Sequence, residues 1–119
     1  MTSRSLLVAA VVLVAVASAA AHSALDRAEP RPGSRLRTSP PEVKVWFTER
    51  LEPAFSTLRV ENAAGQRVDR ADGHVDAADR TLMRVGLAPL SAGAYRVVWR
   101  VLSVDSHVTE GGFTFRIER

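Results

Sequence analysis

The segment "SVDSHVTEGG", residues 103–112, places two side chains that bind metals, Asp105 and His107, two positions apart. A carboxylate and an imidazole are ligands for several divalent metals, and both groups also serve in acid–base catalysis. If the segment is extended, residues two apart face the same side, so these two side chains point together. Alone, Asp-X-His is equally an ordinary turn, in which the aspartate caps backbone N–H groups and the imidazole is exposed at a strand end. A metal site therefore needs further ligands from elsewhere in the chain.

A further ligand depends on how the N-terminus is processed. Arg4 precedes an apolar run over residues 6–17, and the small residues 17–21 follow. This order is typical of a secretory signal peptide. The competing interpretation is a transmembrane anchor, but the run is shorter than the roughly 20 residues of a membrane span, and no basic stop follows it closely. Cleavage after Ala21 would leave a mature chain that begins at His22.

A histidine at the first mature position offers two nitrogen ligands. Its α-amine has a pKa of about 8, well below that of lysine, and the amine and the imidazole Nδ1 can close one chelate ring on a metal. With Asp105 and His107, His22 would give three nitrogens and one oxygen. Such a set suits tetragonal Cu(II), although Zn(II) accepts similar ligands in a tetrahedron. The alternative is a histidine that falls by chance in a frayed terminus.

Composition limits the remaining chemistry. The 119 residues include no cysteine, which excludes thiolate metal sites and cysteine catalysis. Removing Arg4 from the 16 Lys and Arg leaves 15 against 13 Asp and Glu, a net charge of +2. These charges are intermixed without a basic stripe, which argues against nucleic-acid binding. We predict a signal peptide over residues 1–21 and one domain over residues 22–119, whose size allows a modest single core.

The elements that must position these ligands are strands. Apolar and polar residues alternate with period two, and glycines and prolines separate the alternating stretches, including Gly111-Gly112 before the last one. No segment of the mature chain has helical periodicity of useful length. Many short strands in about 100 residues predict an all-β fold, an antiparallel sandwich or barrel, with Asp105 and His107 at one end. The alternating stretches are residues 43–48, 58–61, 82–85, 95–101 and 113–117.

Individual residues sharpen this prediction. Tyr95, just after the turn at Gly93, is typical of the tyrosine corner of Greek-key sandwiches. Trp99 lies in the longest apolar stripe and is expected in the core, whereas Trp46 faces the other way and is expected to be partly exposed or under a loop. Residues 69–80 are the most polar stretch and are expected to form an exposed connection.

Three stretches of the chain carry the motifs of one known protein family. The predicted mature start, "HSALDRAEPRPG", has the family's His, a Leu three residues on, and Pro-X-X-Gly. "VWFTERLEP", residues 45–53, is similar to the family's F-[ST]-E strand. Residues 90–117 resemble its C-terminal signature, in which Gly-X-Tyr-X-Val-X-Trp-Arg-Val precedes Ser-X-Asp-X-His, a glycine and an alternating Phe strand. The order and spacing are specific, and the likeness spans essentially all of the mature chain. By these residues the chain resembles the CopC family of periplasmic copper-binding proteins.

The resemblance implies a cupredoxin-like or immunoglobulin-like sandwich that binds one Cu(II) per chain. The ligands it implies are His22, through amine and imidazole, with Asp105 and His107. It also places Glu49 near the metal, where the carboxylate could orient the amine or a bound water, or ligate weakly; the alternative is a surface carboxylate at a strand end. Family members often have glycine where this chain has Ser106, a mild change unless that position needs a positive φ.

A second departure concerns Cu(I). Some members of the family carry a methionine-rich loop with a histidine, and soft thioethers are the ligands that Cu(I) prefers. The mature chain has one methionine, Met83, in an alternating stretch, and its polar loop holds His74 without methionines. We expect a packing role for Met83, a surface position for His74, and no methionine-rich Cu(I) site.

The function expected from the ligand set, the signal peptide and the resemblance is non-enzymatic. It is copper carriage, sequestration or resistance in the periplasm, or outside a cell with a single membrane, without a stable membrane anchor after processing. The resemblance further suggests cooperation with a CopD-like inner-membrane protein. One alternative is a copper monooxygenase with an N-terminal histidine brace, although the anionic Asp105 favours Cu(II) and discourages redox cycling. The other alternative is a metal-free sandwich module that mediates interactions.

Overall fold

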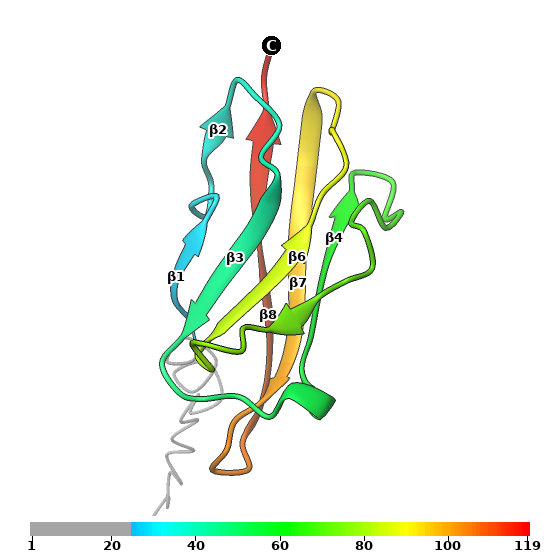
Figure 1. Ribbon diagram of the computed structural model, residues 1–119. Coiled ribbons are helices and arrows are strands. Elements are labelled where there is room, and N and C mark those ends of the chain that lie inside the picture. The colour runs from blue at the N-terminus through cyan, green and yellow to red at the C-terminus, as the bar shows by residue number, and fades with distance from the viewer. Residues whose placement is uncertain (1–24) are drawn as a thin grey trace, which may run out of the picture.

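The computed structural model describes residues 25–119, which form a sandwich of two four-stranded sheets (Figure 1). The predicted signal peptide and His22 lie outside the described residues. The first sheet has the order β1 (Leu25–Glu29), β3 (Glu42–Phe47), β6 (Leu82–Gly86), β5 (His74–Val75), and the second has the order β2 (Arg35–Leu36), β8 (Val108–Ile117), β7 (Gly93–Leu102), β4 (Thr57–Asn62). A 3-10 turn, η1 (Pro53–Phe55), lies between β3 and β4. No helix within residues 25–119 is long and apolar enough to cross a membrane.

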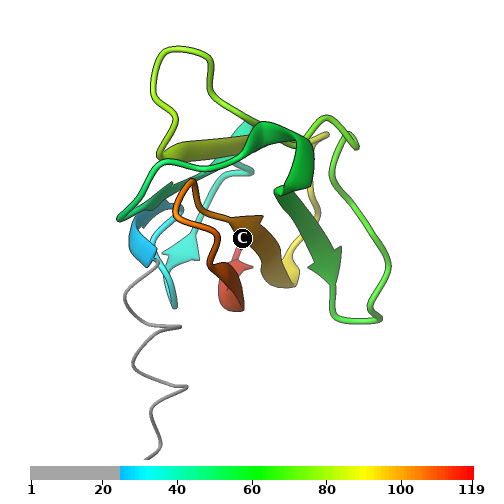
Figure 2. The same ribbon diagram turned by 90° about the horizontal axis from the view of Figure 1, so that it is seen from below.

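The chain crosses repeatedly between the two sheets, so neighbours in sequence lie in different layers. Consecutive strands β1 to β4 alternate between the sheets, and only the pairs β5–β6 and β7–β8 are adjacent both in sequence and in space. The end-on view in Figure 2 shows the two layers with the β7–β8 hairpin facing the viewer. This architecture confirms the predicted all-β sandwich.

The core is formed by the inward-facing residues of the alternating strands, as predicted. Inward-facing residues of β3, β4, β7 and β8 are buried while their neighbours are exposed or half-buried, because each strand covers the core with one face only. Trp99 is 4% exposed, as predicted, and its ring meets Phe47 of the opposite sheet edge-on, with centroids 5.6 Å apart. The buried core comprises Ala28, Val43, Val45, Phe47, Leu51, Leu58, Val60, Val75, Met83, Val85, Leu87, Leu90, Tyr95, Val97, Trp99, Val101, Phe115 and Ile117.

Two further expectations are confirmed by side-chain contacts. The Tyr95 hydroxyl donates a hydrogen bond to the Ser91 carbonyl at 2.6 Å, which closes the predicted tyrosine corner. Trp46 is half-buried, and the Arg27 guanidinium lies 3.7 Å from the centre of its ring. The cation covers the outward face of this tryptophan and allows it to sit on the solvent side of the sheet.

The predicted break at Gly111-Gly112 is wrong, because both glycines lie inside β8. A side chain at Gly111 would place its Cβ 2.7 Å from the Trp99 ring, and one at Gly112 would place its Cβ 2.6 Å from the Val97 carbonyl oxygen. The two glycines therefore admit the close approach of β7, including its large tryptophan, and β8 continues through them.

Two other expectations need correction. The sandwich was expected to be antiparallel, but β2 pairs with β8 in parallel through Arg35 opposite Arg116. Residues 69–80 are not simply an exposed connection, because they contain β5, and the Asp69 side chain is fully buried where it accepts a hydrogen bond from the Val60 N–H at 2.8 Å. This polar segment packs against β4 through backbone-directed contacts that composition does not reveal.

Candidate metal centre

Asp105 and His107 lie in the loop that joins β7 to β8, at one end of the sandwich, as predicted. The loop is a tight turn and not the extended segment that the spacing suggested. The Ser103 N–H donates to the His107 carbonyl at 3.0 Å, and the Ser106 N–H donates to the Ser103 carbonyl at 2.9 Å. Ser106 has a φ of 74°, so this position does need the left-handed region that a glycine adopts readily.

The turn brings the two predicted ligands into contact. The His107 Nδ1 lies 3.2 Å from the Asp105 Oδ2, and the imidazole is 81% exposed. The other carboxylate oxygen, Oδ1, accepts a hydrogen bond from the Ser103 hydroxyl. Both oxygens of Asp105 are thus engaged from within the hairpin, which fixes where the carboxylate points.

Glu49 approaches the same place from the other sheet. It lies in the loop after β3, and that loop is bound to the hairpin by the Val104 N–H donating to the Arg50 carbonyl at 2.9 Å and by a bridge between Leu51 and Ser103. Leu51 is 1% exposed, so its burial holds the loop against the sandwich. As a result the Glu49 carboxyl group lies within hydrogen-bonding reach of the Asp105 carboxyl group.

The pKa values of the two carboxyl groups shift in opposite directions. Hydrogen bonds from the Ser103 hydroxyl first, and then from Glu49 and His107, lower the pKa of Asp105 to about 2. The pKa of Glu49 is raised, chiefly because its carboxyl shares a hydrogen bond with Asp105, with further contributions from burial and from the Asp105 charge. Asp105 is therefore a permanent anion at neutral pH, and Glu49 is the member of the pair that takes up a proton first.

A hollow of ≈ 290 Å³ opens beside these groups, lined by Phe47, Glu49, Ser103, Asp105 and His107 among others. Leu25, the first described residue, pairs with Phe47 at the end of β3. The strand β1 therefore begins beside this hollow, at the end of the sandwich from which the β7–β8 hairpin projects (Figure 1).

The described residues bring together three of the four side chains singled out from the sequence: Glu49, Asp105 and His107. The fourth, His22, lies outside them. Within residues 25–119, no group of three or more His, Asp or Glu side chains could hold a metal ion. Ser103 was not predicted as a site residue, although its place in the Ser-X-Asp-X-His motif was the available signal.

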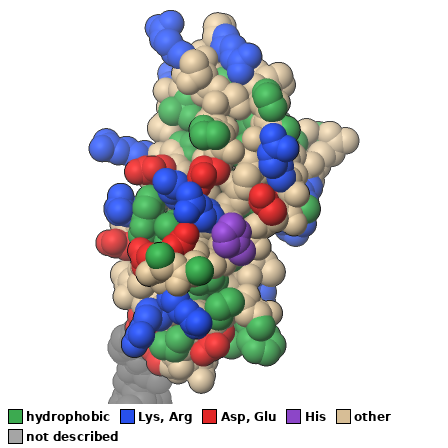
Figure 3. All heavy atoms as spheres, in the orientation of Figure 1, with side chains coloured by type: hydrophobic (Ala, Val, Ile, Leu, Met, Phe, Trp, Pro, Cys, Tyr) green, Lys and Arg blue, Asp and Glu red, His purple; other side chains and the backbone are tan. Residues whose placement is uncertain are grey.

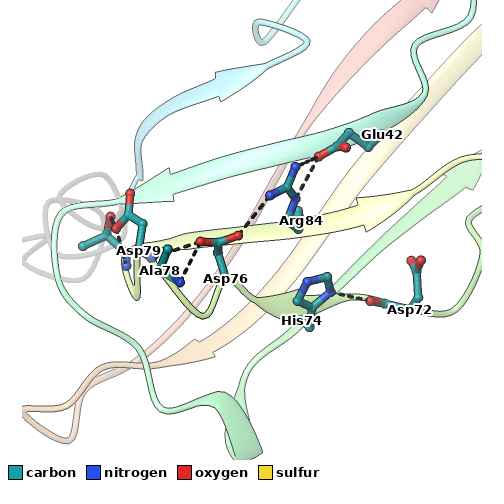
Figure 4. Close-up of polar contacts among 8 residues, drawn as sticks. Glu42, Asp72, His74, Asp76, Ala78, Asp79 and Arg84 are labelled. Carbon is teal, nitrogen blue, oxygen red and sulfur yellow. Dashed lines mark hydrogen bonds and ion pairs between the residues drawn. The ribbon is translucent and has the colours of Figure 1, made fainter.

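The remaining candidates lie elsewhere. Met83 is fully buried in the core, which confirms its packing role. His74 is exposed on the first sheet, and its Nδ1 lies 2.8 Å from the Asp72 carbonyl oxygen (Figure 4). The face of the molecule in Figure 3 carries intermixed basic and acidic side chains, in line with the mixed charges of the sequence.

Comparison with known proteins gives one consistent result. The CopC domain family matches residues 25–118. Copper resistance protein C of Pseudomonas syringae pv. tomato is 32% identical over 123 residues, which cover 98% of this chain and 96% of that protein. The crystal structure of CopC from Methylosinus trichosporium OB3b superposes with a TM-score of 0.71 and 30% identity, over 82% of this chain and 94% of that one.

A longer relative also matches. Copper transport protein CutJ of Bacillus subtilis (strain 168) is 31% identical over 98 residues, which cover 82% of this chain. The chain spans only 18% of the length of CutJ, so that protein has a large part with no counterpart here. The family match over residues 25–118, the shared fold and the full-length relative lead to one conclusion: the chain belongs to the CopC family.

Proposed function

We propose that this chain is an exported copper-binding protein that holds one Cu(II) at the β7–β8 end of the sandwich. Its ligands are the amine and imidazole of a mature N-terminal His22, together with Asp105 and His107. The observation that carries the proposal is the contact between Asp105 and His107 at 3.2 Å, beside the hollow where β1 begins. The proposed role is copper carriage, sequestration or resistance.

The position of β1 supports His22 as the missing ligand. Leu25 is paired with Phe47, and Phe47 lines the hollow together with Asp105 and His107. His22 precedes Leu25 by three residues, a reach of at most about 11 Å for an extended chain. A mature N-terminus at His22 can therefore bring its two nitrogens to the hairpin.

The described residues have the chemistry that such a site needs. Asp105 is ionised at neutral pH, because its pKa is lowered to about 2, and it contributes an anionic oxygen. Two imidazoles, an amine and one carboxylate form a nitrogen-rich set that suits Cu(II). Glu49 lies beside Asp105 and is proposed to orient that ligand or a bound water. Met83 is buried, and the proposal includes no methionine-rich Cu(I) site.

Relatives support the proposed setting. Copper resistance protein C and copper transport protein CutJ carry copper in their names, and CutJ joins a region similar to this chain to a much longer sequence. We propose that this chain is non-enzymatic, acts in the periplasm or outside a cell with a single membrane, and passes copper to a CopD-like membrane protein. The anionic Asp105 favours retention of Cu(II) over redox cycling.

The test uses the chain of residues 22–119 with a free amine on His22. Calorimetric titration with Cu(II) should give one ion per chain, and electron paramagnetic resonance should show hyperfine structure dominated by nitrogen. Affinity should fall as the pH decreases, because protons compete for the amine and imidazoles. A chain that binds no Cu(II), or binds it without nitrogen ligands, would rule out the proposal.

Matched variants identify the ligands. His107→Ala should weaken Cu(II) binding by more than roughly 100-fold, because substitutions of groups that only orient the ligands already cost up to that much. His74→Ala removes an imidazole on β5, outside the β7–β8 hairpin, and should leave the affinity unchanged. One residue added before His22 should also weaken binding strongly, since it removes the amine from the chelate. Ascorbate-driven oxidation of a polysaccharide would instead favour the monooxygenase alternative.

A further inference from the structure

We infer that Ser103 is a positioning residue that holds Asp105 and His107 together through a single hydroxyl. This inference rests on the proposed function, since it assigns a role toward the proposed copper ligands. Ser103 is 8% exposed, and within residues 25–119 only Ser56 matches it as a buried polar residue, at 7%. Neither the sequence motif nor the family match assigns a role to this hydroxyl.

The hydroxyl contacts both ligand residues. The Ser103 Oγ donates a hydrogen bond to the Asp105 Oδ1 and accepts one from the His107 N–H at 3.3 Å. It also lies 3.2 Å from the His107 carbonyl oxygen. A hydroxyl carries one proton, and an ionised carboxylate can only accept, so the proton belongs to Asp105, and the backbone of His107 supplies the complementary donor.

These contacts restrict what each ligand can do. With Oδ1 held by Ser103, the Asp105 carboxylate keeps Oδ2 toward the His107 Nδ1, 3.2 Å away. The backbone of Ser103 is itself fixed, because it pairs with Leu51 and its N–H donates to the His107 carbonyl at 3.0 Å. Without the hydroxyl, the Asp105 Oδ1 would lose its hydrogen bond, rotation of the side chain about χ1 would be less restricted, and a metal would have to order it on binding.

Ser56 provides a matched control. Ser56 is as buried as Ser103, and its hydroxyl accepts a hydrogen bond from the Leu102 N–H at 3.1 Å, at the end of β7 next to the hairpin turn. It contacts neither proposed ligand. Ser56→Ala therefore removes the same group at the same end of the sandwich, and any general effect of losing a buried hydroxyl appears in both variants.

The experiment compares Ser103→Ala, Ser103→Thr and Ser56→Ala in the chain that starts at His22. We expect Ser103→Ala to lower Cu(II) affinity by roughly 10- to 100-fold, which is the range found for groups that orient ligands. We also expect it to change the electron paramagnetic resonance spectrum of the bound Cu(II). Ser103→Thr keeps the hydroxyl and should restore most of the affinity, while Ser56→Ala should bind as the parent does. Equal affinities of Ser103→Ala and Ser56→Ala would overturn the inference.

A second measurement does not depend on copper. In the metal-free protein, nuclear magnetic resonance couplings should report one χ1 conformer for Asp105 in the parent and in Ser56→Ala, and averaged conformers in Ser103→Ala. An unchanged single conformer in Ser103→Ala would also overturn the inference. If the parent binds no copper, the proposed function fails, and this measurement still decides whether Ser103 positions Asp105.

Discussion

Ser106 shows how one non-glycine residue adopts a backbone conformation that glycine adopts readily. Its φ of 74° lies in the left-handed region, where an L-residue costs about 1–2 kcal/mol relative to the right-handed region. Its N–H still donates to the Ser103 carbonyl at 2.9 Å, so the turn that presents Asp105 and His107 is intact. The small, exposed serine tolerates this conformation, and a branched side chain should not.

We therefore expect Ser106→Val to lower the free energy of unfolding by about 1–2 kcal/mol beyond the cost that serine already bears, because a β-branched residue tolerates a positive φ less well than serine. Ser106→Gly should change it by less than about 1 kcal/mol, because the relief of strain is offset by the greater freedom of glycine in the unfolded chain. Denaturant unfolding of the three proteins measures both effects. Because position 106 is exposed, packing should not obscure the comparison. Equal stability of the Val and Gly variants would contradict the role given to φ.

At the scale of elements, an ion-pair network fastens the segment after β5 to β3 across the first sheet (Figure 4). The Arg84 guanidinium lies 3.0 Å from the Asp76 Oδ1 and 2.8 Å from the Glu42 Oε1. The other Asp76 oxygen accepts hydrogen bonds from the Ala78 and Asp79 N–H groups at 3.0 and 2.9 Å. The Arg84 hydrogen bond, followed by these backbone donors, lowers the pKa of Asp76.

This lowered pKa predicts the sign of an acid dependence. A carboxyl whose pKa is lower in the folded chain stabilises the fold above its ordinary value of 3.8, and this contribution is lost as the pH falls through the lower folded value. Asp76→Asn should therefore unfold at a lower denaturant concentration than the parent at pH 7, and the difference should shrink as the pH approaches 2. Denaturant unfolding at several pH values measures it.

Glu110→Gln is the control for this prediction. Glu110 pairs with Arg100 at 2.8 Å, but its side chain is 67% exposed, so the loss of this pair should change stability by less than about 1 kcal/mol. The difference in stability between Asp76→Asn and the parent would stay constant from pH 7 to pH 2 only if the charge of the Asp76 carboxylate did not contribute. Such a constant difference would contradict the prediction.

The strands show which elements the sequence could predict. Alternation identified the buried faces of β3, β7 and β8, because a strand that covers a core with one face must alternate. Gly111 was misread as a break, since its meaning depends on the Trp99 ring of the neighbouring strand. The two-residue strand β2 and its parallel pairing lack any periodicity to detect.

At the scale of the whole molecule, the candidate site depends on contacts between distant segments. Residue types and order identified Asp105 and His107, and the resemblance added Glu49. The approach of Glu49 to Asp105 depends on a loop after β3 that Leu51 holds against the β7–β8 hairpin. Such a contact is set by how the two sheets pack, and a single sequence does not specify it. The role of Ser103 likewise follows from the turn geometry alone.

The same arrangement predicts how copper should affect the stability of the sandwich. His22 precedes β1 of the first sheet, whereas Asp105 and His107 lie in the hairpin of the second, so a metal held by all three joins the two sheets at one end. A ligand that binds only the folded state stabilises it by about 2.7 kcal/mol at a free concentration of 100 times Kd. For a domain of this size, such a gain corresponds to a rise in Tm of roughly 10–20 °C.

We expect this rise when Cu(II) is added to the chain that begins at His22, and we expect a chelator to reverse it. Calorimetric melting measures both steps. The rise should be much smaller when one residue precedes His22, because the amine no longer joins β1 to the hairpin. Binding of Cu(II) to the N-terminus of the unfolded chain would reduce the effect in the parent, since only differential binding stabilises. Equal rises in the two chains would show that copper is held within one sheet, and the proposed link between β1 and the β7–β8 hairpin would be wrong.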